Sequence, residues 1–224
     1  MASSITVRPY RPGDRAAVRQ ICHFTGYMGD PISWQWRDRE SFADTFSSYY
    51  TDREPESSLV AELDGQVVGY LLGCRRSALV GDPIQPIYRH LLGRGLLVRA
   101  GTAGVLWRSV RDGLVELAHR RPLARELSDP AFPAHLHINL LPAARGQGVG
   151  RQLVSRWFAT LVAEGVPGCH LATWAENAGA IAFFGSVGFR PLGPAVAMPG
   201  MRSPSGARHH VQWMATELPT PAAP

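Results

Sequence analysis

The stretch Arg145-Gly146-Gln147-Gly148-Val149-Gly150 decides the fold of this 224-residue chain. Residues Ala134–Leu141 before it alternate polar and apolar side chains with a period of two, which predicts a strand. Glycines between a strand and a helix let consecutive backbone N–H groups converge at the positive end of the helix dipole. The stretch therefore predicts a binding site for a phosphate or pyrophosphate group. The helix itself is predicted by apolar residues at helical spacing: Leu153, Val154, Trp157, Phe158, Leu161 and Val162.

The glycine spacing excludes two common nucleotide-binding motifs. A dinucleotide fingerprint, G-x-G-x-x-G/A, requires Gly or Ala where this chain has Arg151. A P-loop requires a lysine, and all 23 basic residues of the chain are arginine. A glycine-rich turn without a ligand is the structural alternative to a binding site.

Two motifs resemble the GNAT superfamily of N-acetyltransferases. The spacing Arg145-x-x-Gly148-x-Gly150 resembles the R/Q-x-x-G-x-G/A pyrophosphate loop of that superfamily. Residues Asn177–Phe189 resemble its N-x-x-A-x-x-F-Y-x-x-x-G-F signature, and one helix and one strand fit between the two motifs. More narrowly, His135–Pro142 and Val67–Gly73 resemble the acetyltransferase-like domain of O-GlcNAcases and its bacterial relatives.

The resemblance implies an α/β fold with a central mixed, mostly antiparallel sheet flanked by helices. We expect a single acetyltransferase domain over residues 5–218, with a helical, Arg-rich insertion at about 77–128 and a disordered tail at 219–224. The sheet should open as a V between strands at 134–141 and 169–174. The residues themselves predict further strands, including a hairpin with an Asp-Gly turn: Ile5–Tyr10, Leu59–Leu63, Gln66–Cys74, Phe189–Met198 and His209–Leu218.

The resemblance also implies acetyl-CoA as co-substrate and a direct transfer in a ternary complex. The backbone of Leu140 and Leu141 would pair with the pantetheine arm, and the Leu140 N–H would bind the oxyanion. Asn177 would contact the pantetheine or phosphate region, or serve only as a helix cap. Together with these three residues, the predicted CoA-binding set contains Arg145, Gly146, Gln147, Gly148, Val149, Gly150 and Arg151.

The residues for proton transfer depart from the family pattern. Phe184 occupies the position of the usual tyrosine, which protonates the leaving thiolate, and Ala134 occupies about that of the usual glutamate. His137, and after it His135, are the nearest titratable substitutes on the polar face of the predicted strand. We assign His137 as the candidate general base, with a purely structural histidine as the alternative.

Two classes of function follow. The first is an N-acetyltransferase that acts on a primary amine of a small molecule or a protein. The alternative is a CoA-binding pseudo-acetyltransferase module with a regulatory or assembly role. For an enzyme, we expect the acceptor to pass the aromatic segment Tyr27–Tyr50, where Trp34, Trp36 and Tyr49 offer ring faces, and the segment Met198–His210.

Composition limits the partners. The net charge is +5, and the segment from Arg75 to Arg125 contains ten arginines and only three acidic residues. Nucleic-acid binding through this segment is the weakest hypothesis, because no aromatic interleaving or binding motif accompanies it; a homodimer contact stays open. Three separated cysteines without a C-x-x-C pair favour free thiols over a metal site. We expect no membrane partner and a cytoplasmic location, because the sequence shows neither a signal peptide nor a membrane-spanning run.

Overall fold

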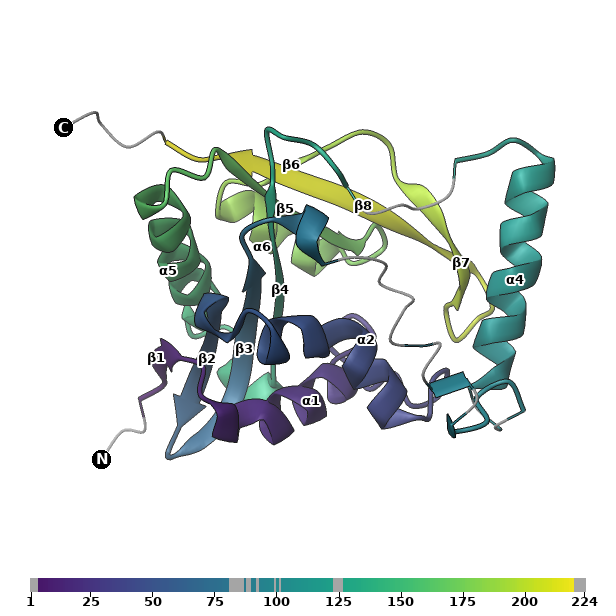
Figure 1. Ribbon diagram of the computed structural model, residues 1–224, viewed down its shortest axis with the longest axis horizontal. Coiled ribbons are helices and arrows are strands. Elements are labelled where there is room, and N and C mark those ends of the chain that lie inside the picture. Colours follow the sequence, from purple (N-terminus) through teal and green to yellow (C-terminus); the bar gives the residue numbers. More distant parts are fainter. Residues whose placement is uncertain are drawn as a thin grey trace.

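The computed structural model describes residues 4–80, 87, 90–91, 93–98, 100, 102–122 and 127–219. An eight-stranded mixed sheet runs through the molecule in the order β1-β2-β3-β4-β5-β8-β6, with β7 paired to β8 (Figure 1). The strands are β1 (Thr6–Pro9), β2 (Ser58–Leu63), β3 (Gln66–Cys74), β4 (Ala134–Leu140), β5 (Gly168–Trp174), β6 (Arg190–Pro191), β7 (Val196–Arg202) and β8 (Arg208–Glu217). The helices are α1 (Arg15–Phe24), α2 (Arg39–Asp52), α4 (Ala103–Ala118), α5 (Val149–Ala163) and α6 (Ala178–Ser186).

The sheet opens between β4 and β5. These two strands form the parallel pair of the sheet, and they pair only at Ala134 with Cys169 and at His135 with His170. Beyond these residues the strands diverge, so their carboxyl ends leave backbone groups that no neighbouring strand uses. The predicted V-shaped opening is confirmed.

Helices cover both faces of the sheet. Alternate residues of β3 point to opposite faces, because successive strand side chains alternate. Leu71 packs with Trp157 of α5 in one core, and Leu72 packs with Tyr50 of α2 in the other. The core below α5 also takes in Phe184 of α6. The sheet therefore separates the helix that follows the glycine turn from α1 and α2.

The late strands differ from the sequence prediction. The hairpin of β2 and β3 is confirmed, and its turn places Asp64 and Gly65 at positive φ angles of 49° and 78°. The single strand expected at 189–198 is instead two strands, β6 and β7, that pair with different parts of β8. Gly193, with a φ of 69°, lies between them and turns the chain.

The insertion contributes α4, which packs against β7 at the end of the molecule opposite α5 (Figure 1). Two acidic side chains attach α4 to the sheet: Asp112 lies 2.5 Å from Arg202, and Glu116 lies 2.5 Å from Arg208. Within the same basic segment, Arg94 pairs with Asp38 at 2.9 Å. These three ion pairs bind charged side chains of the segment to other parts of the same chain. Of the predicted tail, residues 220–224 lie outside the described part of the chain.

Candidate functional site

The glycine turn presents a row of backbone donors. Gly146 and Gly148 have φ angles of 72° and 75°, a left-handed conformation that glycine adopts without steric cost. The first bond into α5 is donated by Gln152 to the Gly148 carbonyl, at 3.1 Å. Within the described part of the chain, no acceptor is found for the N–H groups of residues 146–151. Free donors at the N-terminus of a 15-residue helix suit a pyrophosphate.

Gly150 is required for packing. A Cβ atom at this position would lie 2.9 Å from Cζ of Phe183, a distance that real Cβ atoms essentially never show. The buried glycine therefore lets α5 approach α6 closely. Its sequence pattern predicted a phosphate-binding residue, and the structure adds a steric reason for the same glycine.

The backbone at the end of β4 separates the roles of Leu140 and Leu141. The Leu141 N–H donates to the Val68 carbonyl at 2.8 Å, and its own carbonyl accepts from Ala144 at 2.9 Å. Both backbone groups of Leu141 are therefore already engaged within the protein, and its pairing with pantetheine stays a prediction. Antiparallel pairing with β3 alternates along a strand, so the N–H of Leu140 points away from β3, into the opening.

Arg145 joins the end of β4 to the loop after α1. Its Nε donates to the Leu140 carbonyl at 3.0 Å, and its Nη2 donates to the Gly29 carbonyl at 2.6 Å. Gly29 has a φ of 94°, and a Cβ there would lie 2.9 Å from the guanidinium. The predicted pyrophosphate residue thus holds two carbonyl oxygens with its side chain. No local pattern in the sequence announces this contact.

Asn177 caps α6. Its Oδ1 accepts the Ala180 N–H at 3.0 Å, which satisfies one of the free donors at the helix start. The cap alternative is therefore confirmed, and a contact with CoA stays a prediction. At the other end of α6, the Ser186 carbonyl accepts a 3.1 Å hydrogen bond from the side chain of Arg151.

The two predicted histidines of β4 lie in a buried aromatic cluster. His135 is hydrogen-bonded on both ring nitrogens, to the Tyr50 hydroxyl at 2.5 Å and to Ser77 Oγ at 2.6 Å. The His137 ring lies 5.3 Å from that of Tyr50. Burial, together with the nearby His170, lowers the pKa of His137 to about 4. A base works best with a pKa near the working pH, so His137 is a weaker candidate than the sequence suggested.

The aromatic residues of the acceptor side divide into core and surface. Trp36 is only 6% exposed, and its Nε1 donates to Ser41 Oγ at 2.9 Å, so its predicted place in an acceptor path is wrong. Trp34 is 44% exposed and meets the Tyr27 ring edge-on, with centroids 5.2 Å apart. The Tyr49 hydroxyl donates to Glu54 at 3.3 Å.

Sequence reasoning missed a chain of three polar side chains. The Tyr27 hydroxyl lies 3.1 Å from Nε2 of His209, and Nδ1 of His209 lies 3.1 Å from Glu176. His210 contacts the other oxygen of the same carboxylate at 2.9 Å. Glu176 directly precedes the motif residue Asn177, and this was the available signal. Nothing in the sequence pairs it with a tyrosine on a distant loop.

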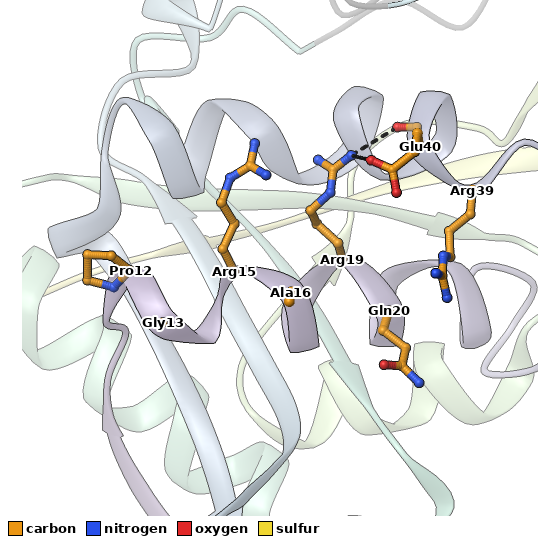
Figure 2. Close-up of a pocket in the computed structure, with 8 residues that line it drawn as sticks. All are labelled: Pro12, Gly13, Arg15, Ala16, Arg19, Gln20, Arg39 and Glu40. Atoms are coloured by element: carbon orange, nitrogen blue, oxygen red, sulfur yellow. Dashed lines mark hydrogen bonds and ion pairs between the residues drawn. The ribbon is translucent and has the colours of Figure 1, made fainter. Parts of the chain in front are cut away.

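A hollow of about 460 Å³ lies elsewhere, between α1 and the start of α2 (Figure 2). It contains none of the predicted site residues. The guanidinium of Arg19 turns toward Glu40, 2.6 Å away (Figure 2). Arg15 pairs with Asp52 at 2.8 Å. Two of the three arginines that line this hollow, Arg15 and Arg19, are thus bound to carboxylates, unlike the free donors of the glycine turn.

The described residues show neither a metal-binding cluster nor a membrane-spanning helix. No group of three His, Cys, Asp or Glu side chains in the described ranges could hold a metal ion. None of the described helices combines the length and the apolar character that crossing a membrane requires.

Comparisons with known proteins give one family match and several solved structures of similar fold. Residues 113–189 match the model of the Acetyltransferase (GNAT) family. The crystal structure of SsHAT is 28% identical, with a TM-score of 0.64 over 96% of this chain and 98% of that chain. The phosphinothricin acetyltransferase from Sinorhizobium meliloti in complex with AcCoA is 17% identical, with a TM-score of 0.56 over 100% and 93%. The ribosomal-protein-S18-alanine N-acetyltransferase from Escherichia coli is 16% identical, with a TM-score of 0.53 over 98% and 97%.

The predicted fold class is confirmed by these matches, and residues 113–189 match the family that the two motifs resemble. The bounds of a single domain over residues 5–218 stay a prediction. At identities below 25%, the similarity to the second and third structures shows the fold alone. The narrower resemblance to the acetyltransferase-like domain of O-GlcNAcases is not confirmed.

Proposed function

We propose that this chain, which carries a GNAT acetyltransferase domain, transfers the acetyl group of acetyl-CoA directly to a primary amine in a ternary complex. The observation that carries the proposal is the row of unused N–H groups at residues 146–151. This row begins six residues after Leu140, the last residue of β4. The N–H of Leu140 faces the opening of the sheet. A phosphate site and a possible oxyanion donor therefore lie on one continuous stretch of backbone.

The pyrophosphate of acetyl-CoA would lie over residues 146–151. Backbone donors and the positive end of α5 supply the attraction, so no lysine is needed. The pantetheine arm would follow the free edge of β4, where the backbone groups of Ile138 and Leu140 face the opening. Arg145 already occupies the Leu140 carbonyl, so the Leu140 N–H is the group left for the substrate.

In the proposed reaction the amine attacks the thioester carbon, a C–N bond forms and the C–S bond breaks. The Leu140 N–H would stabilise the oxyanion of the tetrahedral intermediate, because this donor is fixed in place before the charge develops. His137 is the base that the sequence assigned, and its lowered pKa makes it a weak acceptor for the amine proton.

The acceptor would be a small-molecule or protein amine that reaches the opening past Trp34. A cytoplasmic location is part of the proposal, because all three cysteines are buried free thiols, as expected in a reducing compartment. The runner-up is a CoA-binding pseudo-acetyltransferase, and two observations favour it. Phe184 offers no hydroxyl to the thiolate, and His137 is a weak base.

Ligand binding is the first test. Acetyl-CoA should raise the free energy of unfolding by RT ln(1 + [L]/Kd), about 2.7 kcal/mol at a hundredfold excess over Kd, and so raise the melting temperature. Gly148→Glu places a carboxylate at the phosphate site and should abolish the shift. Gly165→Glu is the matched control, because Gly165 has a similar φ of 70° and open space at the far end of α5. No shift at millimolar CoA, or equal loss in both variants, would overturn the site.

Turnover is the second test. Free thiol released from acetyl-CoA should rise with at least one member of a broad panel of primary amines. Tight acetyl-CoA binding without thiol release from any amine would instead establish the pseudo-acetyltransferase.

A further inference from the structure

The side chains of Tyr27, His209 and Glu176 form a hydroxyl–imidazole–carboxylate chain with two contacts of 3.1 Å. A carboxylate accepts hydrogen bonds and does not donate them, so Nδ1 of His209 carries the proton that faces Glu176. The lone pair of Nε2 then accepts the Tyr27 hydroxyl. This polarity lets a proton pass from Tyr27 to Nε2 of His209, and the Glu176 carboxylate stabilises the imidazolium that forms, as in other hydroxyl–imidazole–carboxylate arrangements.

Strand register places the carboxylate level with the proposed oxyanion donor. Ala134 of β4 pairs with Cys169 of β5. Six residues further along the chain from each stand Leu140, the last residue of β4, and Ala175, the residue after β5. Glu176 is the next residue. The Ala175 N–H is held by the His210 carbonyl at 2.8 Å, so β8 fixes this segment beside the opening. The carboxylate thus stands at the open end, on the β5 side.

Tyr27 approaches the same opening from the β4 side. Arg145 binds both the Leu140 carbonyl and the Gly29 carbonyl, two residues after Tyr27. Tyr27 and Asp30 exchange backbone hydrogen bonds of 2.9 and 2.8 Å, which keep this loop tight. The loop is therefore anchored at the end of β4, while the Tyr27 hydroxyl reaches His209 on β8. The contact between Tyr27 and His209 therefore connects the loop anchored at the end of β4 to β8, the strand next to β5.

We infer that Tyr27 is a catalytic residue that carries the proton from the attacking amine to the departing thiolate, with His209 and Glu176 as its positioning residues. This inference rests on the proposed function. As the C–N bond forms, the amine proton passes to the Tyr27 oxygen and the tyrosine proton passes to Nε2 of His209. As the C–S bond breaks, Tyr27 protonates the sulfur and recovers its proton from His209. The products are the amide and free CoA, and the chain returns to its starting state.

One hydroxyl can serve both atoms, because the nitrogen and the sulfur are bonded to the same carbon of the intermediate. The relay supplies what two motif positions lack, since neither Phe184 nor Ala134 can move a proton.

The surrounding charges suit this role. Burial and the carboxylates of Glu176 and Asp30 raise the pKa of Tyr27, so it stays a hydroxyl at neutral pH. Burial of Glu176 opposes its ionisation, but hydrogen bonds from His210 and His209 lower its pKa overall. Glu176 is therefore ionised and can stabilise the transient imidazolium. Arg145, which binds the Gly29 carbonyl, brings a fixed positive charge to the same loop.

The test uses Tyr27→Phe, Glu176→Gln and the full-length wild-type chain. Thiol release is measured with the amine panel from pH 5.5 to 9, together with acetyl-CoA binding by thermal shift. General acid–base groups contribute about 10²–10⁴-fold, so Tyr27→Phe should lower kcat about a hundredfold or more. Its acetyl-CoA affinity should stay within about twofold of wild type. Tyr10→Phe is the matched control, because it removes a buried hydroxyl that has no partner among the described residues.

The pH profile separates proton transfer from mere support of the loop. Glu176→Gln removes the negative charge beside the imidazole, so the acid limb of kcat should move to lower pH. A limb set by the amine itself would not move between variants. A structural role would lower the melting temperature and leave the limb in place. If Tyr27→Phe does not fold, the position of the acid limb in the kcat profile of Glu176→Gln tests the relay by itself.

The outcomes distinguish the two proposals. Wild-type protein that binds acetyl-CoA but acetylates no amine overturns the proposed transferase, and the relay with it. Wild-type turnover with a Tyr27→Phe kcat within about threefold of normal overturns the relay alone. An unmoved acid limb in Glu176→Gln contradicts the relay in the same way.

Discussion

The Nε atom of Arg145 donates a 3.0 Å hydrogen bond to the carbonyl oxygen of Leu140. This contact fixes the carbonyl of Leu140, the last residue of β4, whose own N–H is the proposed oxyanion donor. The same guanidinium holds Gly29, so the loop that carries Tyr27 is fixed by it as well. A residue predicted to bind the pyrophosphate therefore connects the end of β4 to the loop that carries Tyr27.

Arg145→Ala should lower kcat/KM for the amine about tenfold or more, because both carbonyl contacts are lost. Acetyl-CoA binding should change by less than about threefold, because backbone N–H groups of the turn supply the phosphate contacts. Amine kinetics and acetyl-CoA titration of the same preparation check this. A loss of acetyl-CoA affinity as large as the loss of kcat/KM would place the guanidinium on the phosphate instead.

Gly150→Ala should lower the free energy of unfolding by about 1–3 kcal/mol, because the new Cβ overlaps the Phe183 ring. Gly185→Ala is the matched control. Gly185 lies inside α6 with open space at its Cβ, so alanine there should raise stability by about 0.5–1 kcal/mol. Urea unfolding of both variants gives the comparison. A Gly150→Ala protein as stable as wild type would show that α5 and α6 are not in close contact.

Trp36→Ala and Trp34→Ala should have different effects. Trp36 is buried in the core below α2, so its truncation should cost about 3–5 kcal/mol of unfolding free energy. Trp34 is exposed, so Trp34→Ala should keep most of the stability and raise KM for the amine. Chemical unfolding and amine kinetics measure the two effects. Equal destabilisation by both truncations would contradict the division into core and surface.

His137 should make stability fall between about pH 6.5 and pH 4. Its folded pKa of about 4 lies below the ordinary value near 6.5, so in this window the unfolded chain binds the extra proton. His137→Gln removes this difference in pKa, and one pKa unit corresponds to about 1.4 kcal/mol. The change in unfolding free energy between pH 6.5 and pH 4 should therefore be smaller in the variant by roughly 2–3 kcal/mol. Urea unfolding at several pH values measures it, and NMR titration gives the imidazole pKa directly. A His137 ring that titrates near 6.5 would refute the effect.

Local patterns predicted the parts of the site that are local in sequence. The glycine turn, the cap at Asn177 and the hairpin around Gly65 each depend on residues a few positions apart. Alternation along β4 also indicated which side chains share a face. These features are determined by backbone conformation and side-chain periodicity, which a sequence displays directly.

The rest of the site depends on contacts between distant segments. Arg145 and Gly29 are 116 positions apart, and Tyr27 and His209 are 182 apart, so no spacing rule relates them. Trp34 and Trp36 lie in a non-helical segment without periodicity, and therefore their opposite burial could not be read from the sequence. The free N–H of Leu140, as opposed to Leu141, follows from the β3 register, which the sequence did not specify.

The most direct test of the central claim is a mass-spectrometric assay of acetyl-CoA incubated with the protein and a panel of primary amines. The account predicts that at least one amine gains a single acetyl group while an equal amount of free CoA appears, and that Gly148→Glu abolishes both products. Bound, intact acetyl-CoA with no acetylated amine anywhere in the panel would contradict it.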